Sequence, residues 1–290
     1  MRTLGYLPGG DYSAAFSINN AGQVVGYSNT STHLMGFLWT AAWGITSLPP
    51  LPTNDSCKAF AINSSGEVVG SSSGSEGTHA VVWVGGAIQN LGTLPGDSTS
   101  EAYGINSSGQ VVGKSSGKGK DHAFLWSNGT KRDLGVLPHQ TNSIAQFIND
   151  AGQVVGFSSG PLGTLAFVWD KTEGMQNLGT LPGGDYSQAN GVNSTGVIVG
   201  TSGNALSTHA FIWDASNGLR DLNGLIPENS EVSLAGATAI NDRGQIVAYG
   251  NIHLNHSNDR TLQLDHDAHA GPLHIFLLTP AASGGPTTRK

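Results

Sequence analysis

Short runs of apolar residues alternate with turns rich in Gly, Asn, Ser and Pro along the whole chain. In one unit, the runs 101–106 and 110–114 flank a tight turn, and the runs 122–126 and 132–137 follow after further turns. Pro138 ends the last run, because proline has no N–H to donate to a sheet. No window shows apolar residues at helical spacing with caps. We therefore expect four β-strands in this unit and almost no helix in the chain.

The unit occurs six times, and one Asn marks its period. Successive copies of this Asn are 44, 43, 43, 44 and 48 residues apart, a spacing typical of repeat architectures. Four short strands in about 43 residues match one blade of a β-propeller. We predict an all-β fold, a six-bladed β-propeller with four-stranded blades. The six asparagines are Asn19, Asn63, Asn106, Asn149, Asn193 and Asn241.

Three further positions recur at fixed distances from this Asn. A Gly three residues later supplies the positive φ of a bulged hairpin, while the Asn side chain caps its own turn. A Trp follows the Asn by 20 residues in five units, and an Ala precedes it by four residues in all six. We expect the Trp and the Ala to form the packing between blades, the Ala because neighbouring blades converge near a central axis.

The two ends of the chain hold parts of one blade. The sixth unit has three strands and then runs into Thr279-Pro280 without a fourth, whereas Arg2 to Pro8 matches the missing strand. We predict that this N-terminal strand completes the last blade and closes the ring, since an open solenoid would leave two sheet edges bare. Residues 1–280 then form a single propeller domain, and 281–290 form a disordered tail.

The composition narrows the class of protein. Charged residues make up only 11% of the chain and the net charge is −7, which argues against a protein that binds nucleic-acid phosphates. Cys57 is the single cysteine, so the fold cannot depend on disulfide bonds within the chain. No run approaches 18 apolar residues, so we expect no membrane span. We expect a monomer.

The repeat also resembles a known family. The combination of AYGINSSGQVVG at 102–113, HAFLW at 122–126 and DLGVLP at 133–138 resembles the HAF-repeat proteins, named for His-Ala-Phe. The stretches DLNGLIP at 221–227 and FLLTP at 276–280 are similar to the terminal repeat of that family. The resemblance covers nearly the whole chain. It implies an extracellular bacterial protein, and it implies no assigned activity and no catalytic residues.

The histidine of the HAF stretch is present in four of the six units. Met35 and Leu165 replace it in the first and fourth units. Because the histidines occupy one fixed place on an outer strand, we expect each to hydrogen-bond a neighbouring blade or loop instead of forming a catalytic ring. They are His79, His122, His209 and His274.

The loops that join blades should share one face with the loops that join the second and third strands, and the Asn turns should lie on the opposite face. The blade-joining loops carry Asp, Asn, Ser and two Tyr, which suit a hydroxyl-rich ligand or a hard cation such as Ca²⁺. The alternative is that Asp and Ser only form turns here. The candidate ligand residues are Asp11, Tyr12, Asp97, Asp185 and Tyr186.

An insertion within 251–272 of the sixth unit is not explained by the repeat. Its histidines and aspartates suit Zn²⁺ and other divalent metals, so we take four of them as candidate metal ligands. The alternatives are a mobile polar loop and a lid or specificity loop folded over the ring. The candidate ligands are Asp265, His266, Asp267 and His269.

Two functions are favoured by the sequence, and a purely structural role in a cell-surface assembly is open as well. One is an extracellular binding propeller that recognises a glycan or a protein ligand on the face of the blade-joining loops. The other is a propeller enzyme, a polysaccharide lyase or hydrolase or a lactonase-like enzyme, with a divalent metal (calcium or zinc) and a site completed by the insertion. Propellers host both kinds of function. The blade loops resemble one another and no Gly-x-Ser-x-Gly elbow is present, which favours binding.

Overall fold

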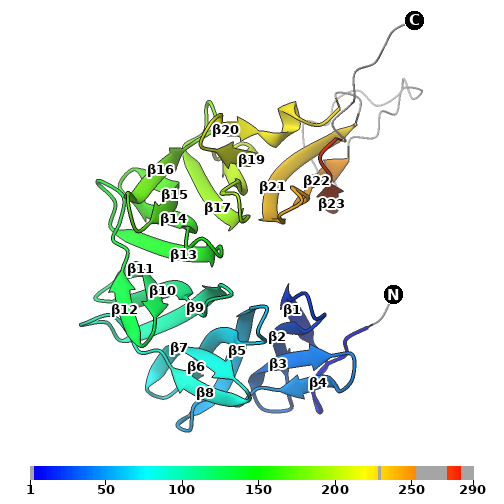
Figure 1. Cartoon of the computed structure of the whole chain (residues 1–290), viewed down its shortest axis with the longest axis vertical. Coiled ribbons are helices and arrows are strands. Elements are labelled where there is room, and N and C mark those ends of the chain that lie inside the picture. Colours follow the sequence, from blue (N-terminus) through cyan, green and yellow to red (C-terminus); the bar gives the residue numbers. More distant parts are fainter. Residues whose placement is uncertain (1–2, 228–229, 253–272, 282–290) are drawn as a thin grey trace, which may run out of the picture. The chain divides into compact units, whose positions relative to one another are not determined.

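The computed structural model describes residues 3–227, 230–252 and 273–281. The chain divides into two compact units, Met1–Asn177 (unit 1) and Leu178–Lys290 (unit 2), and each is described by itself. The fold is all-β, as predicted, and its six antiparallel sheets are the blades of a β-propeller (Figure 1). The only helix in the described residues is a 3₁₀ turn at Leu222–Gly224. None of the described helical structure is long and apolar enough to span a membrane.

Unit 1 contains four blades, each with its four strands in chain order. The first has β1 (Ser13–Ile18), β2 (Val24–Asn29), β3 (Leu34–Thr40) and β4 (Gly44–Ser47). The second has β5 (Asn54–Ile62), β6 (Val68–Gly74), β7 (Gly77–Val84) and β8 (Ala87–Asn90). The third has β9 (Thr99–Ile105), β10 (Val111–Gly117), β11 (Lys120–Ser127) and β12 (Thr130–Asp133). The fourth has β13 (Asn142–Ile148), β14 (Val154–Gly160), β15 (Gly163–Asp170) and β16 (Gly174–Gly179).

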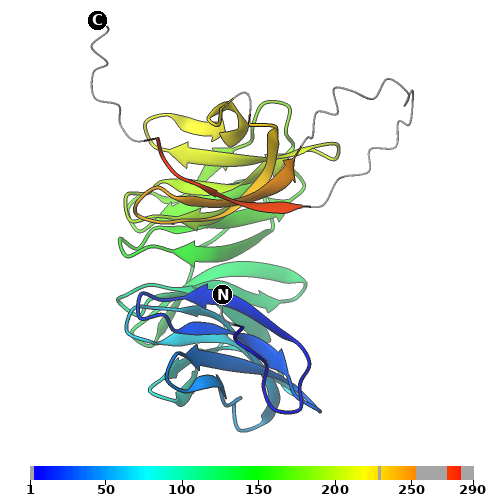
Figure 2. The same cartoon turned by 90° about the vertical axis from the view of Figure 1, so that its right-hand side faces the viewer.

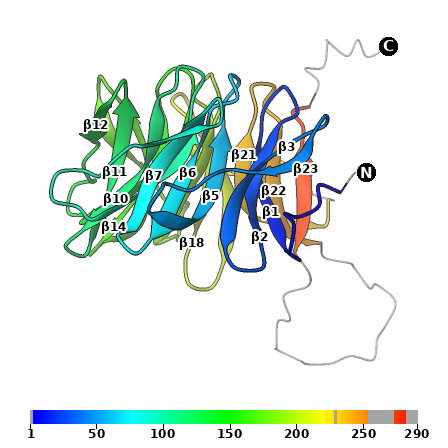
Figure 3. The ribbon, with the colours of Figure 1, turned by 90° about the horizontal axis from the view of Figure 1, so that it is seen from below.

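Unit 2 contains the fifth and sixth blades. The fifth has β17 (Tyr186–Val192), β18 (Ile198–Gly203), β19 (Thr208–Asp214) and β20 (Gly218–Asp221). The sixth has β21 (Val232–Ile240), β22 (Ile246–Ile252) and β23 (His274–Leu278). β23 lies at the edge of this three-stranded sheet (Figure 2). In Figure 3 the consecutive strands of the second blade, β5, β6 and β7, run side by side in the same way.

The repeated Asn closes its own turn, as predicted, and it also joins neighbouring blades. Asn106 Oδ1 accepts from the backbone N–H of Gln110 at 3.0 Å, and Gly109 has the positive φ of +73° that this turn requires. Asn106 Nδ2 donates to the backbone carbonyl of Asn149 in the fourth blade at 3.1 Å. Asn63 Nδ2 donates to the carbonyl of Asn106 in the same way, also at 3.1 Å. The Asn side chain therefore accepts a hydrogen bond within the turn of its own blade and donates one to a backbone carbonyl of the next blade.

Buried Ala and Trp side chains pack between blades, in agreement with the sequence analysis. Trp83 and Trp169 are buried in the clusters that join the first blade to the second and the third to the fourth. The recurring Ala is fully buried in five blades, at Ala59, Ala102, Ala145, Ala189 and Ala237. Ala15 in the first blade is exposed.

The N-terminal segment contacts the first blade as an outer strand contacts the blade that follows it. Ser13 Oγ donates to the carbonyl of Gly5 at 2.8 Å, just as Ser100 Oγ in the third blade donates to the carbonyl of Gly92 at 2.7 Å. These contacts support the assignment of the N-terminal segment to the last blade. Closure of the ring by this strand, and a single domain over 1–280, stay predictions. Arg2 and residues 282–290 of the predicted tail lie outside the described residues.

Candidate functional site

The loops that join blades and the hairpins between the second and third strands lie on one side of each unit, as predicted. In unit 1, the backbone N–H of Asp121, in the hairpin of the third blade, donates to Asn142 Oδ1 at the entrance of the fourth blade, at 3.0 Å. In unit 2, Asn204 Nδ2, in the hairpin of the fifth blade, donates to the carbonyl of Gly183 in the loop before that blade, at 2.9 Å. The hairpin of the third blade is therefore held against the start of β13, and the hairpin of the fifth blade against the blade-joining loop that precedes it.

The carboxylate of Asp11, a candidate ligand residue, already accepts a hydrogen bond within a turn. Asn29 Nδ2 donates to Asp11 Oδ1 at 2.7 Å, and Asn29 Oδ1 accepts from the backbone N–H groups of Asp11 and Tyr12 at 3.1 and 2.8 Å. The Tyr12 ring is 52% exposed, and its centroid lies 6.1 Å from that of Tyr27. A hydrogen bond with Tyr27 raises the pKa of the Tyr12 hydroxyl. Tyr12 thus keeps an open ring face, while Asp11 has a structural role.

Asp97 lies beside a half-buried lysine of the third blade. Its backbone N–H donates to the carbonyl of Leu94 at 3.1 Å, which closes the turn before β9. Burial lowers the pKa of the Lys131 ammonium to about 8, and the charge of Asp97 opposes this shift. The Lys131 ammonium also lies 3.8 Å from the centroid of the Phe124 ring. Asp97 therefore compensates a buried charge in addition to forming its turn.

Asp185 and Tyr186 begin the fifth blade. The backbone N–H of Asp185 donates to the carbonyl of Gly203 at 2.8 Å, and its side chain is exposed. Tyr186 is half-buried, and burial raises the pKa of its hydroxyl, with the neighbouring Tyr249 and Asp185 adding to the shift. The five candidate ligand residues thus belong to blades 1 and 3 of unit 1 and to blade 5 of unit 2.

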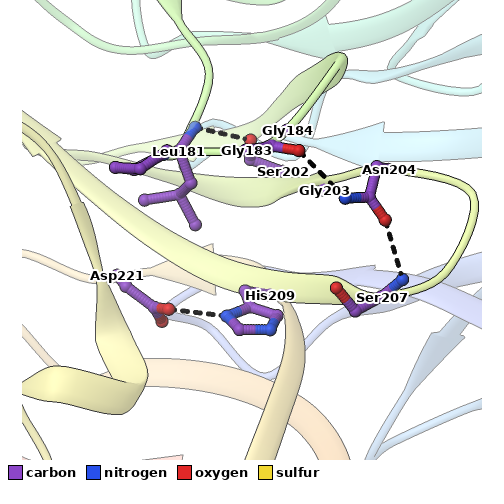
Figure 4. Close-up of a pocket in the computed structure, with 10 residues that line it drawn as sticks. Leu181, Gly183, Gly184, Ser202, Gly203, Asn204, Ser207, His209 and Asp221 are labelled. Carbon is purple, nitrogen blue, oxygen red and sulfur yellow. Dashed lines mark hydrogen bonds and ion pairs between the residues drawn. The ribbon is translucent and has the colours of Figure 1, made fainter.

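A pocket of about 300 Å³ lies in the fifth blade, directly before Asp185 (Figure 4). It is formed by the blade-joining loop, the hairpin between β18 and β19, and the last two strands of the blade. The side chain of Asn204 links the hairpin and the blade-joining loop at the rim of the pocket. Its Oδ1 accepts from the backbone N–H of Ser207 in the hairpin at 3.1 Å, and its Nδ2 donates to the carbonyl of Gly183 in the loop. Its lining residues are Leu181, Pro182, Gly183, Gly184, Ser202, Gly203, Asn204, Ser207, His209 and Asp221.

A His–Asp pair forms one wall of this pocket. His209 Nδ1 lies 2.6 Å from Asp221 Oδ2, and Asp221 Oδ1 accepts from the backbone N–H of Asn223 at 2.8 Å (Figure 4). The third blade repeats the arrangement, with His122 Nδ1 3.0 Å from Asp133 Oδ2. The expectation that these histidines bond a neighbouring blade or loop is therefore wrong for His122 and His209. Each bonds the outer strand of its own blade, where the Asp already caps a turn.

The pocket could be found only in part from the sequence. Its loop residues Gly183 and Gly184 directly precede the predicted Asp185, but Asn204, Ser207 and His209 were not candidate ligand residues. Their signal is the fifth-blade hairpin, where Asn204 follows the strand that ends at Gly203. Only the fold shows that this Asn reaches back to the blade-joining loop.

The predicted metal ligands Asp265, His266, Asp267 and His269 lie outside the described residues, as does most of the insertion 251–272. Within the part of the chain that the structure describes, no group of three or more His, Cys, Asp or Glu side chains could hold a metal ion. Cys57 is buried, and burial raises the pKa of its thiol to about 11. Its sulfur is a neutral packing group that accepts from the backbone N–H of Gly36 at 3.3 Å.

Comparison with solved structures places the chain among β-propellers. A putative TolB from Agrobacterium tumefaciens is similar, with a TM-score of 0.54 and 12% sequence identity over 72% of this chain and 79% of that one. TolB from Acinetobacter baumannii has a TM-score of 0.52 and 12% identity over 79% and 61% of the two chains. A prolyl endopeptidase has a TM-score of 0.56 and 10% identity over 83% of this chain and 39% of the peptidase. At these identities the likeness shows the fold alone.

No family model and no curated protein matches the sequence. The solved structures show the architecture of the chain and leave its ligand to be inferred from its own residues.

Proposed function

We propose that this chain is an extracellular binding propeller of the HAF-repeat type, which recognises a glycan on the face of its blade-joining loops. The observation that carries the proposal is the pocket of the fifth blade, which opens among the loops of that face. Its volume of about 300 Å³ is at the lower end of the range for small-molecule sites. A pocket of this size suits one sugar unit of a longer chain better than a large compact ligand.

The chemistry of the pocket suits a sugar. A sugar unit presents hydroxyl groups around its edge and C–H groups on its faces. The pocket offers Ser207, Asn204 and the imidazole of His209 as hydrogen-bonding groups, and Leu181 and Pro182 as apolar surface. The carboxylate of Asp221 in the pocket wall is already bonded to the imidazole of His209. Hydrogen-bonding groups beside a small apolar surface, with the Asp221 carboxylate already bonded to His209, favour a neutral polyhydroxylated ligand over an ion.

The rim of the pocket is fixed before a ligand arrives. Asn204 joins the hairpin to the blade-joining loop, and the buried Ser202 Oγ accepts from the backbone N–H of Leu181 at 2.9 Å. A rim held in this way loses little conformational freedom on binding, which favours affinity. Asp185 and Tyr186 follow the loop directly and are the predicted residues that lie best for further contacts with the same ligand.

An enzyme is the second candidate, because Ser207, His209 and Asp221 line one pocket. The His–Asp pair recurs in the third blade, at His122 and Asp133, which favours a structural role for it in both blades. Binding without turnover is therefore the better supported function.

Isothermal titration of the full chain with neutral hexasaccharides tests the proposal. We expect Asn204→Ala to weaken binding by about tenfold or more, because it removes the contact that fixes the rim. Thr30→Ala is the matched control: Thr30 holds the corresponding place in the first blade, where its N–H donates to the carbonyl of His33 at 2.8 Å as that of Asn204 does to Ser207 at 2.9 Å.

Equal affinities of the two variants, or no binding of any hexasaccharide, would contradict the proposal. Release of shortened or unsaturated sugar in the same samples would instead support the enzyme. Detection of the natural protein in the cells and not in the medium would contradict the extracellular location.

A further inference from the structure

Five aromatic rings form an unbroken run across the first three blades, and we call them the aromatic stripe. They belong to β1, β2, β5 and β9 and to the loop before β1. Successive ring centroids are 6.1, 5.3, 5.7 and 5.6 Å apart, within the range of direct ring contact. In order, the rings are those of Tyr12, Tyr27, Phe16, Phe60 and Tyr103.

Three of these rings occupy one position of the repeat, a β-bulge on the first strand of the blade. The register of β1 with β2 passes from Ala15 to Ser17 and leaves Phe16 unpaired. Phe60 is passed over in the same way on β5, and Tyr103 on β9. A bulge turns its extra residue out of the regular ladder, so it is a place where a side chain can be directed at a ligand.

The bulge position differs between blades where the packing positions do not. The residue directly before it is Ala in all six blades. The bulged residue, in contrast, is Gln146 in the fourth blade and Asn190 in the fifth. A ring needed only to pack blades together would be expected at the same place in every blade. The three neighbouring rings therefore indicate a feature of this part of the molecule and not of the repeat.

The rings are not absorbed into the core. Phe60 has a ring contact on each side, with Phe16 and with Tyr103, and it is still only half-buried. Phe16 is 52% exposed. Adjoining ring faces left open to solvent are unusual in a chain with few charged residues to compensate for them, and such surfaces commonly mark binding sites.

Charged groups of both signs flank the stripe. The Lys58 ammonium lies 5.3 Å from the Tyr27 ring centroid. At the other end, burial and the neighbouring Glu101 raise the pKa of the Tyr103 hydroxyl, so it stays a neutral donor. Lys114 lies 3.7 Å from Glu101 and 3.6 Å from Asp121. Two cations and two carboxylates balance, so the surroundings of the stripe favour a neutral ligand with many hydrogen-bonding groups.

We propose that the aromatic stripe binds a neutral oligosaccharide, with the C–H faces of its sugar rings stacked on Phe16 and Phe60 and its hydroxyls bonded to the flanking charged groups. The stripe is formed by residues of unit 1 and the pocket of the fifth blade by residues of unit 2, so the two sites share no residue. The inference shares the ligand class of the proposed function but does not depend on the pocket.

Titration calorimetry of the full chain with five hexasaccharides tests this inference: the β-1,4-linked hexamers of glucose, mannose, xylose and N-acetylglucosamine, and the β-1,3-linked hexamer of glucose. Phe60→Leu keeps an apolar side chain but removes the flat ring, and we expect it to raise the Kd of the binding hexasaccharide by about tenfold. Phe60→Tyr keeps the ring and should stay within about threefold of the natural protein. The control is Trp43→Ala, which removes a ring that is 82% exposed and outside the stripe.

The outcomes separate the two sites. Loss of affinity in Phe60→Leu but not in Asn204→Ala supports the stripe and contradicts the pocket, and the reverse result overturns the stripe. Loss in both supports a ligand that uses both sites. If none of the five sugars binds, or if Phe60→Leu and Trp43→Ala bind equally well, the inference is wrong. Retention of sugar binding by Phe60→Leu together with loss of a bound peptide would assign the stripe to a protein partner and overturn it as well.

Discussion

The backbone N–H of Leu7 donates a hydrogen bond to Ser28 Oγ at 3.0 Å, and the same hydroxyl donates to the carbonyl of Tyr12 at 2.9 Å. The hydroxyl is fully buried, and from β2 it joins the segment that enters the blade to the residue directly before β1. Four more blades repeat the contact. The serines there are Ser72, Ser115, Ser158 and Ser202.

Replacement of one of these serines should destabilise the fold without altering its surface. In Ser115→Ala, the backbone N–H of Leu94 loses its acceptor at 2.9 Å inside the protein. A buried polar group left without a partner costs about 1–3 kcal/mol, so we expect a fall of that size in the free energy of unfolding, measured with urea. Ser98→Ala, at an exposed position in the same blade-joining loop as Leu94, should change it by less than about 0.5 kcal/mol. Equal effects of the two changes would contradict this role for Ser115.

Closure of the last blade by the N-terminal strand can be tested by a cross-link. Leu125 pairs with Arg132 in the third blade. The repeat places Leu277 and Arg2 at the corresponding positions, so we expect Arg2→Cys and Leu277→Cys to form a disulfide on mild oxidation. Cys57 should not interfere, because burial raises the pKa of its thiol to about 11.

The readout is mobility on a non-reducing gel. The control pairs Arg2→Cys with Leu162→Cys, an exposed position in the fourth blade, which should stay reduced. A cross-link between two chains would show exchange of the strand between copies and would contradict closure within one chain. No cross-link under conditions that oxidise the unfolded chain would favour the open arrangement.

Asp221 should tolerate Asn far better than Ala. Asn keeps the oxygen that accepts from the backbone N–H of Asn223, as Asn90 does for Gly92 at 2.8 Å in the second blade. Ala loses this contact and the contact with His209. We expect Asp221→Ala to lower the free energy of unfolding by about 1–2 kcal/mol, and Asp221→Asn by less than about 0.5 kcal/mol. The same pair of changes at Asp133 should give the same order; a large loss of stability in both Asn variants would mean that the ion pair itself is essential.

Lys131 should make stability depend on pH in the alkaline range. Burial lowers the pKa of its ammonium to about 8, below the ordinary 10.5. Below pH 8 the lysine is charged in both the folded and the unfolded chain, and the folded state carries the cost of burying the charge. As the pH rises past 8, the folded protein releases the proton before the unfolded chain does, so this cost falls.

The free energy of unfolding of the natural protein should therefore rise relative to that of Lys131→Met between about pH 7 and pH 10. Urea unfolding across this range measures the difference. The exposed Lys120→Met should run parallel to the natural protein. Parallel curves for Lys131→Met too would show that its ammonium is not penalised in the folded state.

The repeat made the strands predictable, because the Asn turn, the Gly with positive φ and the terminal Pro are local features. Contacts that cross between strands or blades were harder to foresee. The Oδ1 of Asn106 binds within its own turn and was predicted, whereas its Nδ2 reaches Asn149, 43 residues away. The partner of His209 was misjudged for the same reason, since the register that brings Asp221 beside it is set by the pairing of β19 with β20.

The sequence predicted the face of the molecule on which the pocket opens, but not the pocket itself. Asp185 and Tyr186 directly follow the blade-joining loop that lines the pocket, but the sequence does not show that the Asn204 side chain bonds back to Gly183 in that loop. The aromatic stripe was missed because a bulge is a local shift in register, and the sequence shows Phe16 and Phe60 only as ordinary apolar residues of a strand.

The Asn contacts between blades have a consequence for how such a chain can grow. Each joint takes its donor from the side chain of one Asn and its acceptor from the main chain of the following Asn, as Asn63 and Asn106 show. The acceptor is a carbonyl, which every residue carries, so a duplicated segment contains both the donor and the acceptor of this hydrogen bond. Copies can then be added in tandem without any new contact having to evolve, and their bulges and loops are left free to diverge.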